Sequence, residues 1–154
     1  MVHRFGMTNV PDPHIDVLTT NECWDLLRTQ VVGRLGVAIM NRPDIFPVNY
    51  VVDHGSIVFR TDEGTKMAAA LLGTAVAFET DHYDPDAGVA WSVVAKGEAV
   101  EIEGPQELFE ATELPLFPWQ LAPRHRFVRI APQEVSGRRF HVNPEALAPV
   151  ATQR

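Results

Sequence analysis

The sequence is poor in cysteine and in positive charge, and it contains no long hydrophobic run. Its single cysteine, Cys23, excludes a disulfide within the chain. The 13 lysines and arginines against 20 aspartates and glutamates give a formal net charge of −7, which argues against broad binding of nucleic acid or of an anionic membrane. No segment is long and apolar enough for a membrane span or a signal peptide, so we expect a cytoplasmic protein.

The hydrophobic content is sufficient for one substantial core. Hydrophobic residues make up 45% of the 154 residues, which predicts a single domain. Residues 1–17 have two prolines and no sustained periodicity, so we interpret them as an N-terminal arm that is ordered only where it packs on something. The domain then covers residues 18–142, and residues 143–154 form a C-terminal tail.

Short runs of strand-forming residues, separated by turns, dominate the chain. The connections between them are too short for helical crossovers, so hairpins and an antiparallel sheet are expected. Gly97, inside the longest run, predicts a bulge or a bend. The pattern is typical of a mainly β fold, a closed or nearly closed antiparallel barrel of six or seven strands. The expected strands span residues 31–40, 45–52, 56–61, 74–80, 89–102, 126–132 and, after a turn, the end of 134–140.

Three short helices are expected between these strands. Thr19 stands three residues before Glu22 in the pattern of a capping box, which predicts a helix start. A second helix is expected from about Lys66 to Leu72, and a third within residues 104–112, with Pro105 in its first turn.

The stretch "VFRTDEGTKMAAALL", residues 58–72, places two cations around an acidic turn that contains glycine. Arg60 leaves a strand and Lys66 begins a helix, so both side chains can converge on one point, where free backbone N–H groups also favour an anion. The hydroxyl groups of Thr61 and Thr65 add donors. A phosphate monoester would suit such a site. The alternative is that the two cations only form surface ion pairs with their acidic neighbours, at little energetic gain.

The order of several motifs resembles that of one protein family. The segments are "RPDIFPVNYVVDHGSIVFRTDEGTKMAAALL", "AVAFETD", "GVAWSVVAKGEAVEI" and the closing "RIAP" and "GRRF". Together they are similar to the pyridoxamine 5'-phosphate oxidase-like family of flavin-binding split β-barrels. The likeness extends from about Glu22 to Phe140.

The resemblance implies a flavin site and a homodimer. In such proteins, Arg60, Thr61, Thr65 and Lys66 would hold the terminal phosphate of flavin mononucleotide (FMN). The backbone of Pro47, Val48, Asn49 and Tyr50 would border the isoalloxazine ring. The family is typically a homodimer with cofactor sites at the interface, so Trp91 and Ser92 would approach a flavin that the other subunit mainly binds.

The resemblance also leaves the chemistry open. The basic and hydroxyl side chains with which the vitamin B6 oxidases grip substrate phosphate have no complete counterpart here, and Arg138 and Arg139 are the nearest candidates. The first expectation is an FMN-dependent oxidoreductase acting on a small molecule. The alternatives are a reductase that uses a deazaflavin coenzyme, and a non-enzymatic flavin- or haem-binding protein.

The remaining residue types add little chemistry. Tyr50, Trp91 and Trp119 could shape a pocket over a flat ring, although Trp91 suits core packing equally well. The six histidines lack the spacing of metal ligands, so no metal site is expected, and His125 is the one that could meet an anion. No nucleophile elbow or carboxylate pair is present, and no catalytic residue can be assigned.

Overall fold

The fold is a small antiparallel barrel with two short helices in the described part of the chain. The computed structural model describes residues 14–62, 73–116 and 125–142. The expected helix at residues 66–72 lies outside this part. In chain order the elements are β1 (Ile15–Val17), α1 (Thr20–Leu27), β2 (Val32–Ile39), β3 (Arg42–Asp53), β4 (Ser56–Asp62), β5 (Ala75–Asp84), β6 (Val89–Glu101), α3 (Pro105–Thr112) and β7 (His125–His141).

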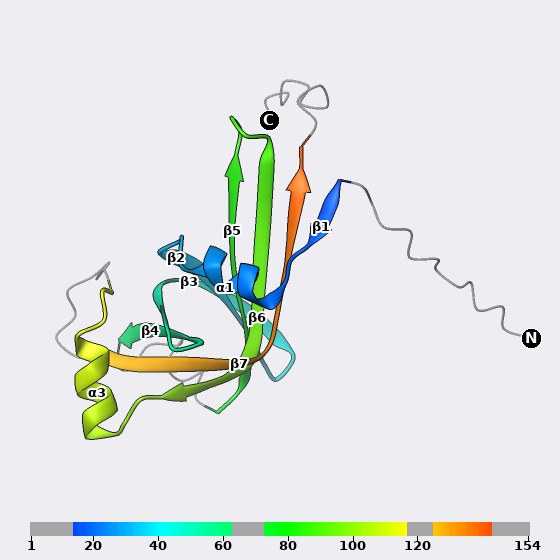
Figure 1. Cartoon of the computed structure of the whole chain (residues 1–154). Coiled ribbons are helices and arrows are strands. Elements are labelled where there is room, and N and C mark those ends of the chain that lie inside the picture. The colour runs from blue at the N-terminus through cyan, green and yellow to red at the C-terminus, as the bar shows by residue number, and fades with distance from the viewer. Residues whose placement is uncertain (1–13, 63–72, 117–124, 143–154) are drawn as a thin grey trace, which may run out of the picture.

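Six strands form a closed ring. The strand order is β1-β7-β4-β3-β2-β5-β6, every pairing is antiparallel, and β6 also pairs with β7. β1 is added to the edge of β7 outside the ring (Figure 1). The prediction of a mainly β, six- to seven-stranded antiparallel split barrel is therefore confirmed.

β7 is one continuous strand of 17 residues, where the sequence suggested a strand, a turn and a second short strand. It runs beside β4, then bends and continues upward beside β6 and β1 (Figure 1). Gly137, which indicated a turn, lies within the β6–β7 ladder opposite Val93. A side chain there would approach the Cys23 Sγ atom to 2.8 Å, so the glycine serves close packing instead.

Two other boundaries differ from those expected. Met40 and Asn41 both have positive φ, 47° and 61°, and form a two-residue turn, so β3 begins at Arg42 instead of Ile45. β5 continues to Asp84 through residues expected in a loop, because β6 pairs with it along that whole length. At Gly97 the register of β6 and β7 shifts, which confirms the predicted bulge.

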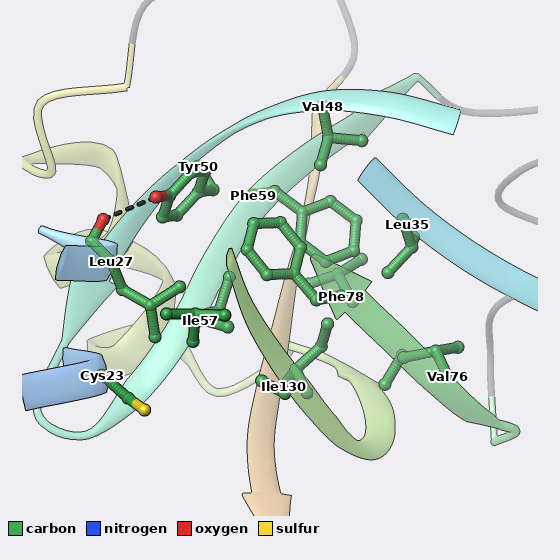
Figure 2. Packing of buried hydrophobic residues seen from close by; sticks show 14 of the residues in the cluster. Cys23, Leu27, Leu35, Val48, Tyr50, Ile57, Phe59, Val76, Phe78 and Ile130 are labelled. Atoms are coloured by element: carbon green, nitrogen blue, oxygen red, sulfur yellow. Dashed lines mark hydrogen bonds between the residues drawn. The ribbon is translucent and has the colours of Figure 1, made fainter. Parts of the chain in front are cut away.

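The main core fills the barrel and is covered at one side by α1. Phe59 and Phe78 lie near its centre, while α1 contributes Cys23 and Leu27 (Figure 2). The capping box predicted at Thr19 is present. Burying these apolar side chains supplies most of the stability of such a fold.

A second, smaller core lies on the outer face of β4, beneath α3. It joins Val58, Ile102, Ala111 and Phe127. Successive residues of a strand point to opposite faces, so β4 contributes alternate side chains to the two cores. The candidate functional site lies near the C-terminal end of β4.

The described part of the predicted N-terminal arm packs on β7. β1 pairs with β7 over three residues, and the Asp16 carboxylate lies 2.7 Å from the His141 ring. None of the described helices has the length and apolar character needed to cross a membrane.

Candidate functional site

Arg60 and Thr61 lie near the end of β4, on opposite faces of the strand. Arg60 stands opposite Phe127 of β7 and faces the small core under α3, whereas Thr61 stands opposite Arg126 and faces the barrel interior. The sequence predicted that both side chains grip one phosphate. In the structure the two side chains lie on opposite faces of β4, so a ligand would reach them from two different sides.

The Arg60 guanidinium is already oriented by the backbone. Its Nη2 atom donates a hydrogen bond of 2.8 Å to the carbonyl oxygen of Leu116, which follows α3. The side chain is partly buried, so its charge is less screened than that of a fully exposed arginine. Such an arginine suits recognition of a phosphate group.

Thr61 carries a buried hydroxyl group that lacks a protein partner. The residue is 2% exposed, and its Oγ1 atom has no hydrogen-bond partner in the part of the chain that the structure describes. A buried polar group in this condition is costly unless something else satisfies it. A ligand oxygen is one such group.

Arg126 and Glu101 are two further polar residues at this end of the barrel. Arg126 lies directly across from Thr61, and its Nε atom is 3.5 Å from the Glu101 Oε1 atom. Sequence reasoning did not place either residue in the site. The available signal was the spacing of Arg126 and Val128. Residues two apart in a strand share a face, so Arg126 is predicted to point inward together with Val128.

The predicted ring-binding segment lies across an opening from β4. β3 and β4 pair from the Asp53–Ser56 pair up to the Tyr50–Phe59 pair, and beyond it the described residues of both strands continue without pairing to each other. There β3 stays with β2, while β4 stays with β7. The segment Pro47–Tyr50 and the pair Arg60–Thr61 therefore flank the same split in the barrel.

Within this segment the side chain of Tyr50 belongs to the core. Its hydroxyl group donates a 2.5 Å hydrogen bond to the carbonyl oxygen of Leu27, and its ring meets Phe78 edge-on at 4.7 Å between centroids (Figure 2). Burial raises the pKa of Tyr50 to about 12. The side chain is thus held away from any ring outside the barrel, and contact through the backbone of Pro47, Val48, Asn49 and Tyr50 stays a prediction.

Trp91 and Ser92 lie far from Arg60 in the same chain. They stand opposite Arg139 and Arg138 on β7, at the other end of the β6–β7 ladder from Glu101. Ten residues of strand separate Trp91 from Glu101, which corresponds to roughly 30 Å. One chain does not bring the two groups together, and Trp91 itself packs in the core at 8% exposure.

The C-terminal arginines lie at this same far end. Arg139 is 3.6 Å from the Glu22 carboxylate, and Arg138 is exposed beside Val17 of β1. Their position opposite Trp91 and Ser92 keeps them as candidates for substrate contact.

Several predicted site residues lie outside the described residues. These are Thr65 and Lys66 of the phosphate site, the side chain of His125, and Trp119. Within the described residues, no group of three or more histidine, cysteine, aspartate or glutamate side chains is arranged to hold a metal ion.

A separate charged cluster and two hollows lie on β2 and its neighbours. Arg34 pairs with Glu79 at 2.8 Å and with Asp81 at 2.6 Å. Hollows of about 510 and 610 Å³ adjoin the β2–β3 hairpin, and both are bordered by Pro43 and Asp44. Neither is lined by the Pro47–Tyr50 segment or by Arg60.

Known proteins resemble this chain over most of its length. The solved structure of an FAD-binding protein from Mycobacterium smegmatis is 37% identical and superposes with a TM-score of 0.77, covering 83% of this chain and all of the other. The uncharacterized protein Rv0080 of Mycobacterium tuberculosis is 33% identical over 128 residues, which is 80% of this chain and 84% of the relative. A second uncharacterized protein of that organism, Rv3129, is 36% identical over 95 residues, which is 62% of this chain and 84% of the relative.

A family model provides the assignment. The model described as pyridoxamine 5'-phosphate oxidase matches residues 19–139, which nearly coincides with the range of the resemblance noted in the sequence. Together with the closed antiparallel ring, this match shows that the chain belongs to the pyridoxamine 5'-phosphate oxidase family.

Proposed function

We propose that this protein binds a flavin nucleotide at the split between β3 and β4 and, with this cofactor, acts as an oxidoreductase on small molecules. The observation that carries the proposal is the buried hydroxyl of Thr61, which has no partner among the described residues, beside the oriented guanidinium of Arg60. Phosphate oxygens of a flavin nucleotide, approaching the end of β4 from its two faces, would satisfy both. The similarity to a protein named as FAD-binding supports the same class of ligand.

The residues have distinct roles in this proposal. Arg60 binds a phosphate oxygen through its remaining N–H groups, and the Thr61 hydroxyl donates to another oxygen. Lys66 and Thr65 add further contacts to the phosphate. The β3 backbone from Pro47 to Tyr50 borders the ring system.

A bound flavin supplies hydride and electron transfer, which the side chains of this chain do not provide. The protein's own part is to bind, to orient and to exclude water. This division of labour accounts for a site with a phosphate grip and without an evident nucleophile or acid–base pair.

The proposal includes a homodimer. The distance between Trp91 and the Arg60 end of one barrel means that both groups can meet one flavin only if they come from different chains. FMN is the ligand first expected from the sequence, and FAD is the one that the name of the relative favours. A deazaflavin coenzyme remains the competing cofactor.

The test is a titration of the full chain with FMN, FAD, riboflavin and a deazaflavin coenzyme, repeated with Arg60→Gln. Loss of one charge-assisted hydrogen bond is expected to weaken binding of the phosphorylated flavins by about 1.5–3 kcal/mol. Riboflavin has no phosphate, so its affinity should not respond.

The matched control is Arg28→Gln, which alters an exposed arginine of α1 that pairs with Asp25. A parent protein that binds none of the four compounds would refute the proposal. The oxidoreductase role fails separately if the reduced, protein-bound flavin is reoxidised by a broad set of acceptors no faster than by oxygen alone.

A further inference from the structure

The β2–β3 hairpin extends past the barrel core and borders a hollow of about 510 Å³. β2 pairs with β5 only over residues 34–36, so residues 37–39 have β3 as their one strand neighbour within the described part of the chain. The volume of the hollow lies within the usual range for small-molecule sites, roughly 300–1,000 Å³.

The strand register fixes which side chains face this hollow. Val37 stands opposite Asp44, and Ile39 stands opposite Arg42. Directly opposed residues of an antiparallel pair lie on the same face, and Val37 belongs to the main core. All four residues therefore line the hollow from the face that continues the barrel interior.

The walls of the hollow are apolar, and part of this surface is open to water. Val37 and Phe46 contribute to the floor, while Ile39 is 38% exposed and Met40, at the tip of the hairpin, is 91% exposed. Exposed apolar side chains that gather around a hollow are typical of a binding surface. The occupant should therefore have an apolar body.

Among the described residues that line this hollow, Arg42 is the only cation. Its side chain is exposed and forms no hydrogen bond or ion pair with another described residue. The Asp44 carboxylate beside it accepts a 2.9 Å hydrogen bond from the backbone N–H of Ile45. An arginine with its N–H groups available, in a chain of net charge −7, favours an anion locally and can form two parallel bonds to a carboxylate.

The hollow adjoins the segment assigned to the flavin ring. Phe46 lines it and directly precedes Pro47, where that segment begins. Arg42 lies four residues before Phe46, which corresponds to roughly 13 Å along an extended strand. A molecule held at Arg42 by an acid group would therefore extend toward the ring.

We propose that this hollow is the substrate site and that the substrate is a small organic acid, an apolar body with one carboxylate. This inference rests on the function proposed above. The carboxylate binds Arg42, and the apolar body lies against Ile39 and Phe46. The opposite end of the molecule meets the flavin at the segment Pro47–Tyr50.

The experiment is a calorimetric titration of the full chain, without flavin and saturated with FMN or FAD. The probes are octanoate and 3-phenylpropanoate, each compared with its neutral amide. We expect the parent to bind the acids about tenfold more tightly than the amides, and Arg42→Gln to remove that difference by weakening the acids alone. Ile39→Thr should weaken acids and amides alike by several-fold, because apolar contact is lost. The control Arg28→Gln should change none of them. In the flavin-loaded protein, the acids should also shift the visible absorption spectrum of the flavin.

Three results would overturn the inference. Acids and amides that bind the parent equally well, or not at all, remove the role of Arg42. Acid binding that Arg42→Gln leaves unchanged assigns the acids to another place, and an unchanged flavin spectrum separates the hollow from the ring. A parent that binds no flavin refutes the proposed function itself, whereas a flavin-loaded parent that fails with the acids refutes only this inference.

Discussion

Thr61 buries a hydroxyl group that has no hydrogen-bond partner among the described residues, and this makes a sharp prediction for one substitution. Thr61→Val keeps the branched shape and removes the hydroxyl. Without ligand, the variant is expected to be more stable than the parent by about 1 kcal/mol, because the cost of the unsatisfied group disappears. Flavin binding should weaken at the same time. Chemical denaturation with and without FAD measures both effects.

The matched control for this substitution is Thr80→Val. Thr80 is equally buried, but its Oγ1 atom donates a 3.0 Å hydrogen bond to the carbonyl oxygen of Val32. This variant should therefore be less stable than the parent by about 1 kcal/mol. If Thr61→Val destabilises the free protein as much as Thr80→Val does, the hydroxyl of Thr61 has a structural partner and no role in ligand binding should be assigned to it.

At the scale of single residues, the sequence identified Arg60 and Thr61 but not how they are directed. Both end the same strand, and the alternation of strand side chains sends Arg60 toward α3 and Thr61 into the barrel. Arg126 escaped notice for a related reason. Its relation to Thr61 depends on the pairing of two strands that are 65 positions apart, and no local pattern encodes that register.

At the scale of the elements, β2 contains two glycines that differ in the space available for a side chain. A Cβ atom at Gly33 would lie 2.2 Å from the Phe78 ring, and one at Gly36 would have its nearest contact at 3.6 Å. Gly33→Ala is expected to destabilise the protein by about 1–3 kcal/mol, because the central ring must move. Gly36→Ala should change stability by less than about 0.5 kcal/mol. Thermal or urea unfolding of the two variants gives the comparison, and equal effects would contradict this packing.

The helix α1 makes a prediction about pH. The backbone N–H of Thr19 donates to the Glu22 carboxylate at 3.2 Å, and this bond is the main cause of the lowered pKa of Glu22, followed by the Thr19 hydroxyl. A carboxyl group with a lowered pKa in the folded state adds stability above its ordinary pKa of 4.5 and loses that contribution as pH falls through the folded value.

Glu22→Gln keeps an oxygen for the capping bond and removes the titration. The parent should therefore be more stable than Glu22→Gln at neutral pH, and the difference should shrink below pH 4.5 and vanish once pH has fallen through the lowered pKa of the folded state. Denaturation midpoints of both proteins over a pH series measure this. A difference that stays constant with pH would show that the charge of Glu22 does not contribute.

The elements themselves were largely predictable, and their ends were less so. Runs of β-branched residues located the strands of the ring, and Thr19 with Glu22 located α1. A turn was expected at residues 41–44, but its position at Met40 and Asn41 was not anticipated, because neither residue is glycine and the positive φ angles follow from the pairing of β2 with β3. The length of β7 likewise depends on its partners β4 and β6 and not on its own composition.

At the scale of the whole molecule, the short connections between strands already favoured a closed or nearly closed antiparallel barrel, and the family resemblance specified a split β-barrel. The closing contact, β6 with β7, joins strands separated by α3 and by residues outside the described part. The candidate site was predictable to the extent that it lies in β3 and β4, which are neighbours in the chain. The contribution of Trp91 and Ser92 depends on a second chain and stays a prediction.

The ring closed by β7 has a consequence for how the protein folds during synthesis. β7 follows every other element of the described residues, yet it pairs with β1, β4 and β6. Until it leaves the ribosome, β4 and β6 each keep an unpaired edge, and exposed edges invite contacts with other chains. Slow translation would lengthen the time for which these strand edges stay exposed. The nascent chain should therefore need chaperones until the final strand closes the ring.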